Sequence, residues 1–178
     1  MTDTAVDTAS PVPLGSDNAL FDVTGLDLSG TAMDKAAIER WIPHRGDMSL
    51  LSRVAWIAED NSRCVAAKDC RDGEFWVAGH FPHLPVLPGV LMIEAAAQTM
   101  CMMYNLRFQA LHTGIFTRIE ECSFRGSVGV GQSLHLLIEE IRFTRRGFQA
   151  KTQGWVAGQR AFDAKLSGVV MTDKFQSG

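Results

Sequence analysis

The stretch from Val90 to about Leu111 constrains the fold of this chain more than any other part of the sequence. It contains no glycine or proline and is mostly apolar or small, so it predicts one long helix. Apolar residues occur on nearly all sides of this helix, and such a helix has to be surrounded by protein or by lipid. A membrane span is disfavoured because Glu94 would lie within it, where an ionised side chain costs about 2.5–3.5 kcal/mol. We therefore expect a helix buried in protein and no membrane association.

Three prolines, Pro82, Pro85 and Pro88, precede this helix. Each fixes its own φ angle and pushes the residue before it toward extended conformations, so we expect residues 81–87 to be rigid and not helical. Pro88 suits the first position of the helix, where its missing N–H costs nothing. Gly89 next to it leaves room for a ligand or another chain to approach the first amides of the helix.

The rest of the chain has the pattern of a β-sheet. Six segments alternate in polarity or are rich in β-branched and aromatic residues, and we expect each to be a strand: Leu50–Ala58, Asn61–Asp69, Ile115–Phe124, Leu134–Phe143, Phe148–Val156 and Ala161–Met171. Arg146-Gly147 and Gly158-Gln159 are tight-turn candidates, so the last four segments predict an antiparallel meander. One face of the sheet has to cover the apolar helix, which gives an α+β fold class.

The N-terminal region differs in composition from the rest of the chain. Residues 1–33 are rich in Ser, Thr, Asp, Gly and Pro, and we expect a largely irregular tail that lays the apolar patch Ala19–Val23 on the body. Thr31 and Asp34 resemble a capping box at the start of a short helix from Asp34 to Trp41. A single domain is expected over residues 34–174.

Composition excludes several classes of function. The net charge of −3 argues against nucleic acid as the main partner. The four cysteines form no Cys-x-x-Cys pair, and the acidic N-terminus lacks the pattern of a secretory signal, so we expect reduced thiols in a cytoplasmic protein. His80 and His83 could ligate a metal, but no third ligand is evident, and we expect neither metal nor cofactor.

One acidic residue, Glu94, interrupts the apolar helix, and Gln98 follows one turn later on the same face. A carboxyl group in apolar surroundings favours its protonated form, which can donate a proton near neutral pH. Glu94 could also point into solvent at an edge of the fold. His80 taken alone is more often structural than catalytic, but the rigid proline segment joins it to Glu94, and this pairing favours chemistry.

The residues around this pair resemble a known family. Gly-His-Phe-Pro at 79–82, Pro-Val-Leu-Pro-Gly-Val-Leu at 85–91 and Ile-Glu-Ala at 93–95 are similar to the FabZ branch of the 3-hydroxyacyl-(acyl carrier protein) dehydratases, which have the hot-dog fold. Ile-Pro-His-Arg at 42–45 and Ser-Arg-Val at 52–54 resemble further pieces of that pattern, so the resemblance covers about residues 42–170. The related FabA branch has Asp where this chain has Glu94. The chain departs from the pattern at Gly46-Asp47-Met48, where the family usually has Tyr-Pro-Phe, and at Ser52, where Asp is common.

The resemblance implies a long helix wrapped by an antiparallel sheet of about six strands, and subunits that pair into a homodimer or a trimer of dimers. It implies an active site at the dimer interface, with His80 of one subunit facing Glu94 of the other. His80 would take the C2 proton of a 3-hydroxyacyl group carried by acyl carrier protein, and Glu94 would protonate the leaving hydroxyl. The product would be the trans-2-enoyl-acyl carrier protein of fatty-acid or related lipid biosynthesis.

The other expected substrate contacts lie on either side of this pair. The amides of Gly89 and Val90 would donate to the thioester oxygen, Gln98 would orient Glu94, and Phe81 would contact the substrate. We expect helix residues such as Leu91 and Met102 to line the acyl tunnel.

Two other functions remain open from the sequence alone. A hot-dog thioesterase would use a carboxylate to activate water, without requiring His80 in its Gly-His-Phe-Pro setting. A non-catalytic acyl-binding paralogue would account for the departures near Gly46, although an intact pair of His80 and Glu94 argues against it.

Overall fold

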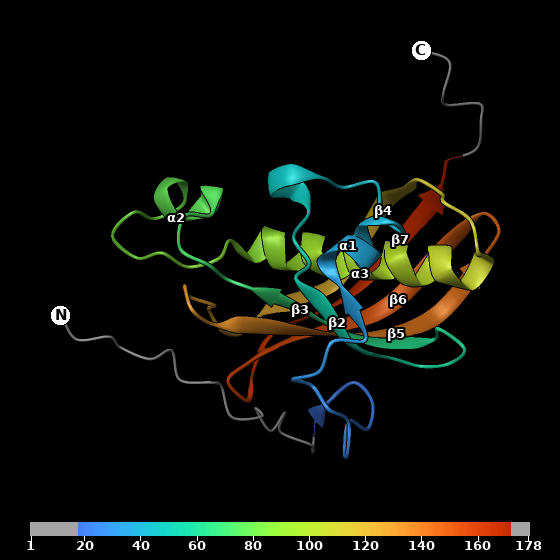
Figure 1. The fold of residues 1–178 in the computed structure, drawn as a ribbon, viewed down its shortest axis with the longest axis horizontal. Helices are drawn as coiled ribbons and strands as arrows, with labels where there is room; N and C mark the ends of the chain where they lie inside the picture. Colours follow the sequence, from blue (N-terminus) through green and yellow to red (C-terminus); the bar gives the residue numbers. More distant parts are fainter. Residues whose placement is uncertain (1–17, 172–178) are drawn as a thin grey trace, which may run out of the picture.

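A computed structural model describes residues 18–171, and the remaining residues of the expected N-terminal tail lie outside it. Within this range seven strands form one sheet in the order β1-β2-β3-β5-β6-β7-β4, and every neighbouring pair is antiparallel. The strands are β1 Met33–Asp34, β2 Arg53–Ile57, β3 Arg63–Asp69, β4 Gly114–Phe124, β5 Ser133–Thr144, β6 Gly147–Val156 and β7 Gln159–Val170. The sheet curves around one long helix, α3, which lies against its concave face (Figure 1). This arrangement confirms the α+β hot-dog class.

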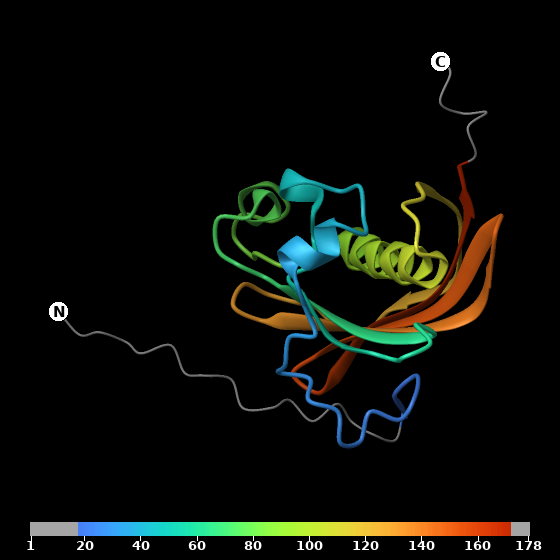
Figure 2. The ribbon, with the colours of Figure 1, turned by 45° about the vertical axis from the view of Figure 1, so that its right-hand side comes forward.

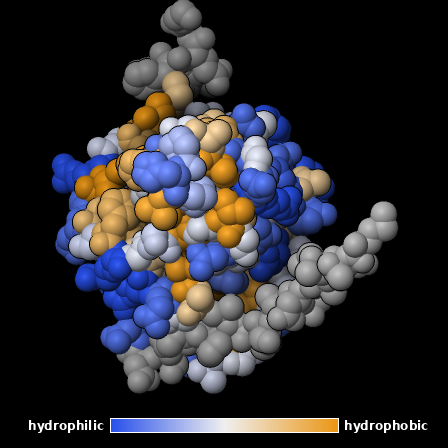
Figure 3. Space-filling view, turned by 90° about the vertical axis from the view of Figure 1, so that its left-hand side faces the viewer, coloured by the Kyte–Doolittle hydropathy of each residue, from blue (hydrophilic) through white to orange (hydrophobic). Residues whose placement is uncertain are grey.

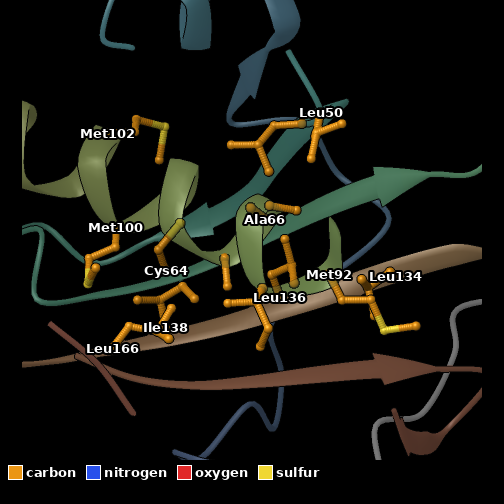
Figure 4. Packing of buried hydrophobic residues seen from close by; sticks show 14 of the residues in the cluster. Leu50, Cys64, Ala66, Met92, Met100, Met102, Leu134, Leu136, Ile138 and Leu166 are labelled. Atoms are coloured by element: carbon orange, nitrogen blue, oxygen red, sulfur yellow. The ribbon is translucent and has the colours of Figure 1, made fainter. Parts of the chain in front are cut away.

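The long helix α3, Gly89–Phe108, is buried along most of its length. Pro88 is its N-cap and not its first helical residue as expected, and Gln109 ends it in the left-handed conformation with φ of 50°. The helix therefore stops before Leu111, because the Gln109 N–H turns back to the carbonyls of the last turn. Figure 4 shows Met100 of α3 near Ile138 and Leu166 of the sheet and Met102 on the opposite side of the helix, and both belong to the buried apolar core.

The C-terminal strands form the expected meander only in part. β5, β6 and β7 are joined by two-residue turns, and Ala157 and Gly158 of the second turn both have positive φ, as a type I′ turn requires. β4 does not pair with β5, as a simple meander would require, but lies beyond β7 at the edge of the sheet. The connection from β4 to β5 therefore returns across the sheet, and β4 keeps one side without a neighbouring strand among the described residues.

The N-terminal part of the domain supplies one strand more than the six expected. This strand, β1, is only two residues long and leads directly into α1, Lys35–Glu39. The N-cap of α1 is Asp34, whose side chain accepts from the Ala37 N–H, so the capping box expected from Thr31 is wrong. Before β1, Phe21 and Val23 are buried against the convex face of the sheet, on the side opposite α3 (Figure 2).

Two short helices lie in the connecting segments, one before β2 and one between β3 and α3. The 3-10 helix η2, Gly46–Met48, follows the Ile-Pro-His-Arg motif, and α2, Phe75–Gly79, precedes the proline segment. Neither was expected from the sequence. Residues 81–87 are not helical, as predicted, and the Leu87 N–H donates to the Val128 carbonyl, which ties this segment to the loop before β5.

Candidate active site

Glu94 lies in the second turn of α3 and is held by the residue one turn further on. Gln98 Nε2 donates to Glu94 Oε1 at 2.9 Å and to the Met48 carbonyl at 2.7 Å. Gln98 Oε1 accepts from the Leu50 N–H at 3.0 Å, and because that N–H can only donate, the orientation of the amide is fixed. Gln98 is fully buried. The helix and the loop before β2 together therefore fix one oxygen of Glu94.

His44 is the second residue at the Glu94 carboxylate. Its Nε2 lies 3.4 Å from Glu94 Oε1, and its Nδ1 is buried with no hydrogen-bond partner among residues 18–171. Burial lowers the pKa of the His44 imidazole, the negative charge of Glu94 opposes this, and Arg45 adds to the lowering. Arg45 also braces the loop by donating to the carbonyls of Glu39 and Ile42. The imidazole is thus held beside Glu94 and favours its neutral form.

Sequence reasoning assigned no role at the site to His44. The contact joins a loop residue to a helix residue fifty positions later (94 − 44 = 50), and no local periodicity reports a contact of that kind. The Ile-Pro-His-Arg motif was the available signal, because it resembles a piece of the family pattern, although a structural role at the strand entry was the expectation for His44.

Glu94 and His44 line a small, mostly apolar cavity of about 100 Å³ between α3 and the strands at the β4 edge. The lining residues are His44, Glu94, Ala97, Met100, Cys101, Gly114, Phe116 and Phe148. Burial raises the pKa of the Cys101 thiol to about 11, so this group stays neutral and acts as a small apolar side chain. Leu91 and Met102, which we expected in the acyl tunnel, do not line this cavity. Met102 is turned by about a quarter of a helical turn from Glu94 and lies in the core.

His80 lies at the end of α2, outside the cavity that Glu94 of the same chain lines. Its Nδ1 lies 2.9 Å from the Val86 carbonyl oxygen, and its ring stacks on Phe81 with centroids 3.9 Å apart. A carbonyl oxygen can only accept, so Nδ1 carries the proton and Nε2 of the neutral ring keeps a free lone pair. The proline segment thus sets the tautomer that a general base at Nε2 needs.

Gly89 and Val90 begin α3, where the first amides have no acceptor within the helix. Pro88, the N-cap, provides no side-chain bond to them. A Cβ on Gly89 would come within 2.8 Å of the Phe124 ring of β4, so glycine lets this exposed ring pack closely against the start of the helix. Val90 and Phe81 are exposed at the surface of the single chain. No group of three or more His, Cys, Asp or Glu side chains in residues 18–171 could hold a metal ion.

Comparison with known proteins shows which family has a similar sequence. A family model described as a FabA-like domain matches residues 42–165. The chain is 33% identical over 145 residues to 3-hydroxyacyl-(acyl-carrier-protein) dehydratase FabZ of Protochlamydia amoebophila, covering 82% of this chain and 94% of that protein. It is 35% identical over 139 residues to the protein of the same name from Janthinobacterium, covering 75% and 88%.

Solved structures show the same fold at lower identity. The dehydratase heterocomplex ApeI:P of Xenorhabdus doucetiae matches with a TM-score of 0.64 and 17% identity, over 77% of this chain and 92% of that chain. A mutant of thioesterase PA1618 from Pseudomonas aeruginosa matches with a TM-score of 0.59 and 12% identity, over 79% and 96%. These two likenesses establish the fold only.

Proposed function

The chain belongs to the FabA-like family, and we propose from this premise that it removes water from 3-hydroxyacyl-acyl carrier protein, as a hydro-lyase of fatty-acid or related lipid biosynthesis. The observation that carries the proposal is Glu94, an acid held by Gln98 in a mostly apolar cavity. The relatives named as FabZ dehydratases match over most of their own length, which supports the same reaction here.

In the proposed reaction Nε2 of His80 takes a proton from C2 of the acyl group. The electron pair forms the C2–C3 double bond, and the C3–O bond breaks as Glu94 gives its proton to the leaving hydroxyl. Glu94 Oε1 already accepts a hydrogen bond from Gln98, and His44 lies beside the same oxygen, so the acidic proton belongs on Oε2. The amides of Gly89 and Val90 donate to the thioester oxygen as negative charge develops on it. A proton passed from His80 back to Glu94 restores the enzyme.

Two subunits complete this site in our proposal. Within one chain His80 does not line the Glu94 cavity, so the base has to come from a second copy. The edge strand β4 offers free backbone groups and exposed Ile115 and Ile119, and such an edge is suited to pairing with another chain. Figure 3 views the end that carries α2 and shows hydrophobic surface among polar surface. We place the paired subunits, as a dimer or a trimer of dimers, on these surfaces.

We place the protein in the cytoplasm, with acyl carrier protein as its partner. Each of the four cysteines, all within the described residues, is a free thiol, as expected in a reducing compartment. No helix in residues 18–171 is long and apolar enough to cross a membrane.

The test follows the mass of 3-hydroxybutyryl-acyl carrier protein during incubation with the enzyme. Wild type should remove the mass of one water, and Glu94→Gln should slow this on the order of a hundredfold or more. Glu139→Gln is the matched control, because Glu139 is half-buried on β5 and lies outside the cavity. Release of free 3-hydroxy acid would instead identify a thioesterase, and no reaction of either kind with this or with longer acyl chains would indicate a non-catalytic subunit.

Mixing inactive variants tests the shared site. His80→Ala and Glu94→Gln are each expected to be inactive, but a dimer with one subunit of each kind contains one intact site. After subunit exchange, half of the dimers are mixed and half of their sites are intact, so about a quarter of wild-type activity should return. A site contained within one chain would give no recovery.

A further inference from the structure

The cavity beside Glu94 has a defined end. One wall is the face of α3 that carries Glu94, Ala97 and Cys101, which lie three and four residues apart and so share one side of the helix. The opposite wall comes from the sheet, where Phe148 of β6 and Phe116 of β4 face the helix. An acyl chain whose C3 hydroxyl meets Glu94 therefore extends from the carboxyl group toward the ring of Phe148.

Two glycines make room for the Phe148 ring at this place. Gly168 of β7 is directly opposite Phe148 in the strand register, and a Cβ there would come within 2.4 Å of the ring. Gly114, the first residue of β4, lies beyond β7 on the same side of β6, and a Cβ there would come within 2.7 Å of the ring. Because real Cβ atoms do not come so close, the ring can lie flat over these strands only where both positions are glycine. Phe148 is buried, with 7% of its surface exposed.

The space beyond Phe148 is filled. The Tyr104 ring lies 5.4 Å from that of Phe148, and Phe108 and Phe143 pack on Tyr104 with centroids 4.6 and 5.6 Å away. Tyr104 donates its hydroxyl to the Thr144 carbonyl at 2.8 Å, which fixes the ring between helix and sheet. An acyl chain cannot continue along α3 without displacing this aromatic cluster, and Phe148 is the member of the cluster that lines the cavity.

We propose that Phe148 closes the acyl cavity and that the protein acts on short 3-hydroxyacyl chains, of about four to six carbons, in preference to long ones. The part of the cavity that one chain forms measures about 100 Å³ and holds about three groups the size of a water molecule, and a methylene group is of that size. This substrate class rests on the proposed dehydration. A longer chain meets the buried Phe148 ring and has to displace packed side chains to enter, which lowers its kcat/KM by about tenfold or more relative to a chain that fits.

The test is a competition among 3-hydroxyacyl carrier proteins of about four, six, eight and twelve carbons in one tube, read by intact mass. Ratios within one tube do not depend on how much of a variant is folded. Wild type should consume the two short substrates at least about tenfold faster than the longest one. Phe148→Ala should shift consumption toward eight and twelve carbons, and the milder Phe148→Leu should do so in part.

Two further variants separate the cavity from general effects. Phe143→Ala removes an aromatic ring of the same cluster that does not line the cavity, and should leave the ratios as in wild type. Ala97→Leu narrows the cavity from the helix side and should lower the six-carbon rate more than the four-carbon rate. Equal consumption of all lengths by wild type, or equal shifts from the Phe148 and Phe143 variants, would overturn the assignment of Phe148. Absence of dehydration at every length would instead remove the proposed function and this inference with it.

Discussion

Replacing Gln98 by leucine tests the central connection of the site. The side chains are similar in size, so the change leaves no large cavity, but it removes three hydrogen bonds. The buried Leu50 N–H then has no acceptor, which costs about 1–3 kcal/mol, and the Met48 carbonyl loses a bond of about 0.5–1.5 kcal/mol. We expect a loss of about 2–4 kcal/mol in the free energy of unfolding.

Thr99→Val is the matched control for this change. Thr99 is the next residue of α3 and is also fully buried, and its hydroxyl donates to the Ala95 carbonyl at 2.9 Å. That carbonyl still accepts the regular helical bond from the Thr99 N–H, so the control should lose less than about 1 kcal/mol. Urea unfolding at one fixed protein concentration measures both values, because the proposed subunit association would make apparent stability depend on concentration.

Activity gives a second measurement on Gln98→Leu. Loss of the bond that fixes Glu94 Oε1 should lower kcat on the order of tenfold to a hundredfold and leave KM little changed, because the acid is misplaced while the thioester contacts remain. If Gln98→Leu were as stable as Thr99→Val and as active as wild type, Gln98 would neither connect helix and loop nor position the acid.

Two other predictions concern stability. Burial, together with Arg53, lowers the pKa of His135 from 6.5 against the opposing effects of Asp69 and a Leu28 backbone hydrogen bond. The unfolded chain therefore binds more protons below about pH 6.5, and the free energy of unfolding should fall as the pH drops from about 7.5 to about 5.5. In His135→Gln the free energy of unfolding should depend less steeply on pH, and the remaining decrease toward low pH should come from His44. An unchanged pH dependence in urea unfolding would contradict this argument. Phe21→Ala, which removes a ring buried on the convex face, should cost about 3–4 kcal/mol. The exposed Asp22→Ala, which loses one hydrogen bond from the Thr24 N–H, should cost less than about 1 kcal/mol; equal small losses would mean that the segment adds nothing to the fold.

The departures from the sequence-based expectations have identifiable physical causes. The strand β1 is too short for a period-2 pattern to be visible, and α2 is one turn of mixed residues. Gln109 ends α3 early in a left-handed conformation, which a glutamine in the sequence does not predict. The place of β4 beyond β7 depends on how the sheet closes around the helix, which is a long-range effect.

The sequence by itself determined the buried helix, the rigid proline segment and the α+β class, because each of these rests on local periodicity or backbone restriction. It also singled out His80 and Glu94 as candidate site residues through a contiguous motif. Only the tertiary structure decided what surrounds Glu94. His44 and the Phe148 ring line the Glu94 cavity from other elements. Gln98 connects Glu94 to the loop before β2 by hydrogen bonds. Such contacts depend on how the sheet wraps the helix, since packing brings together side chains that are far apart in the sequence.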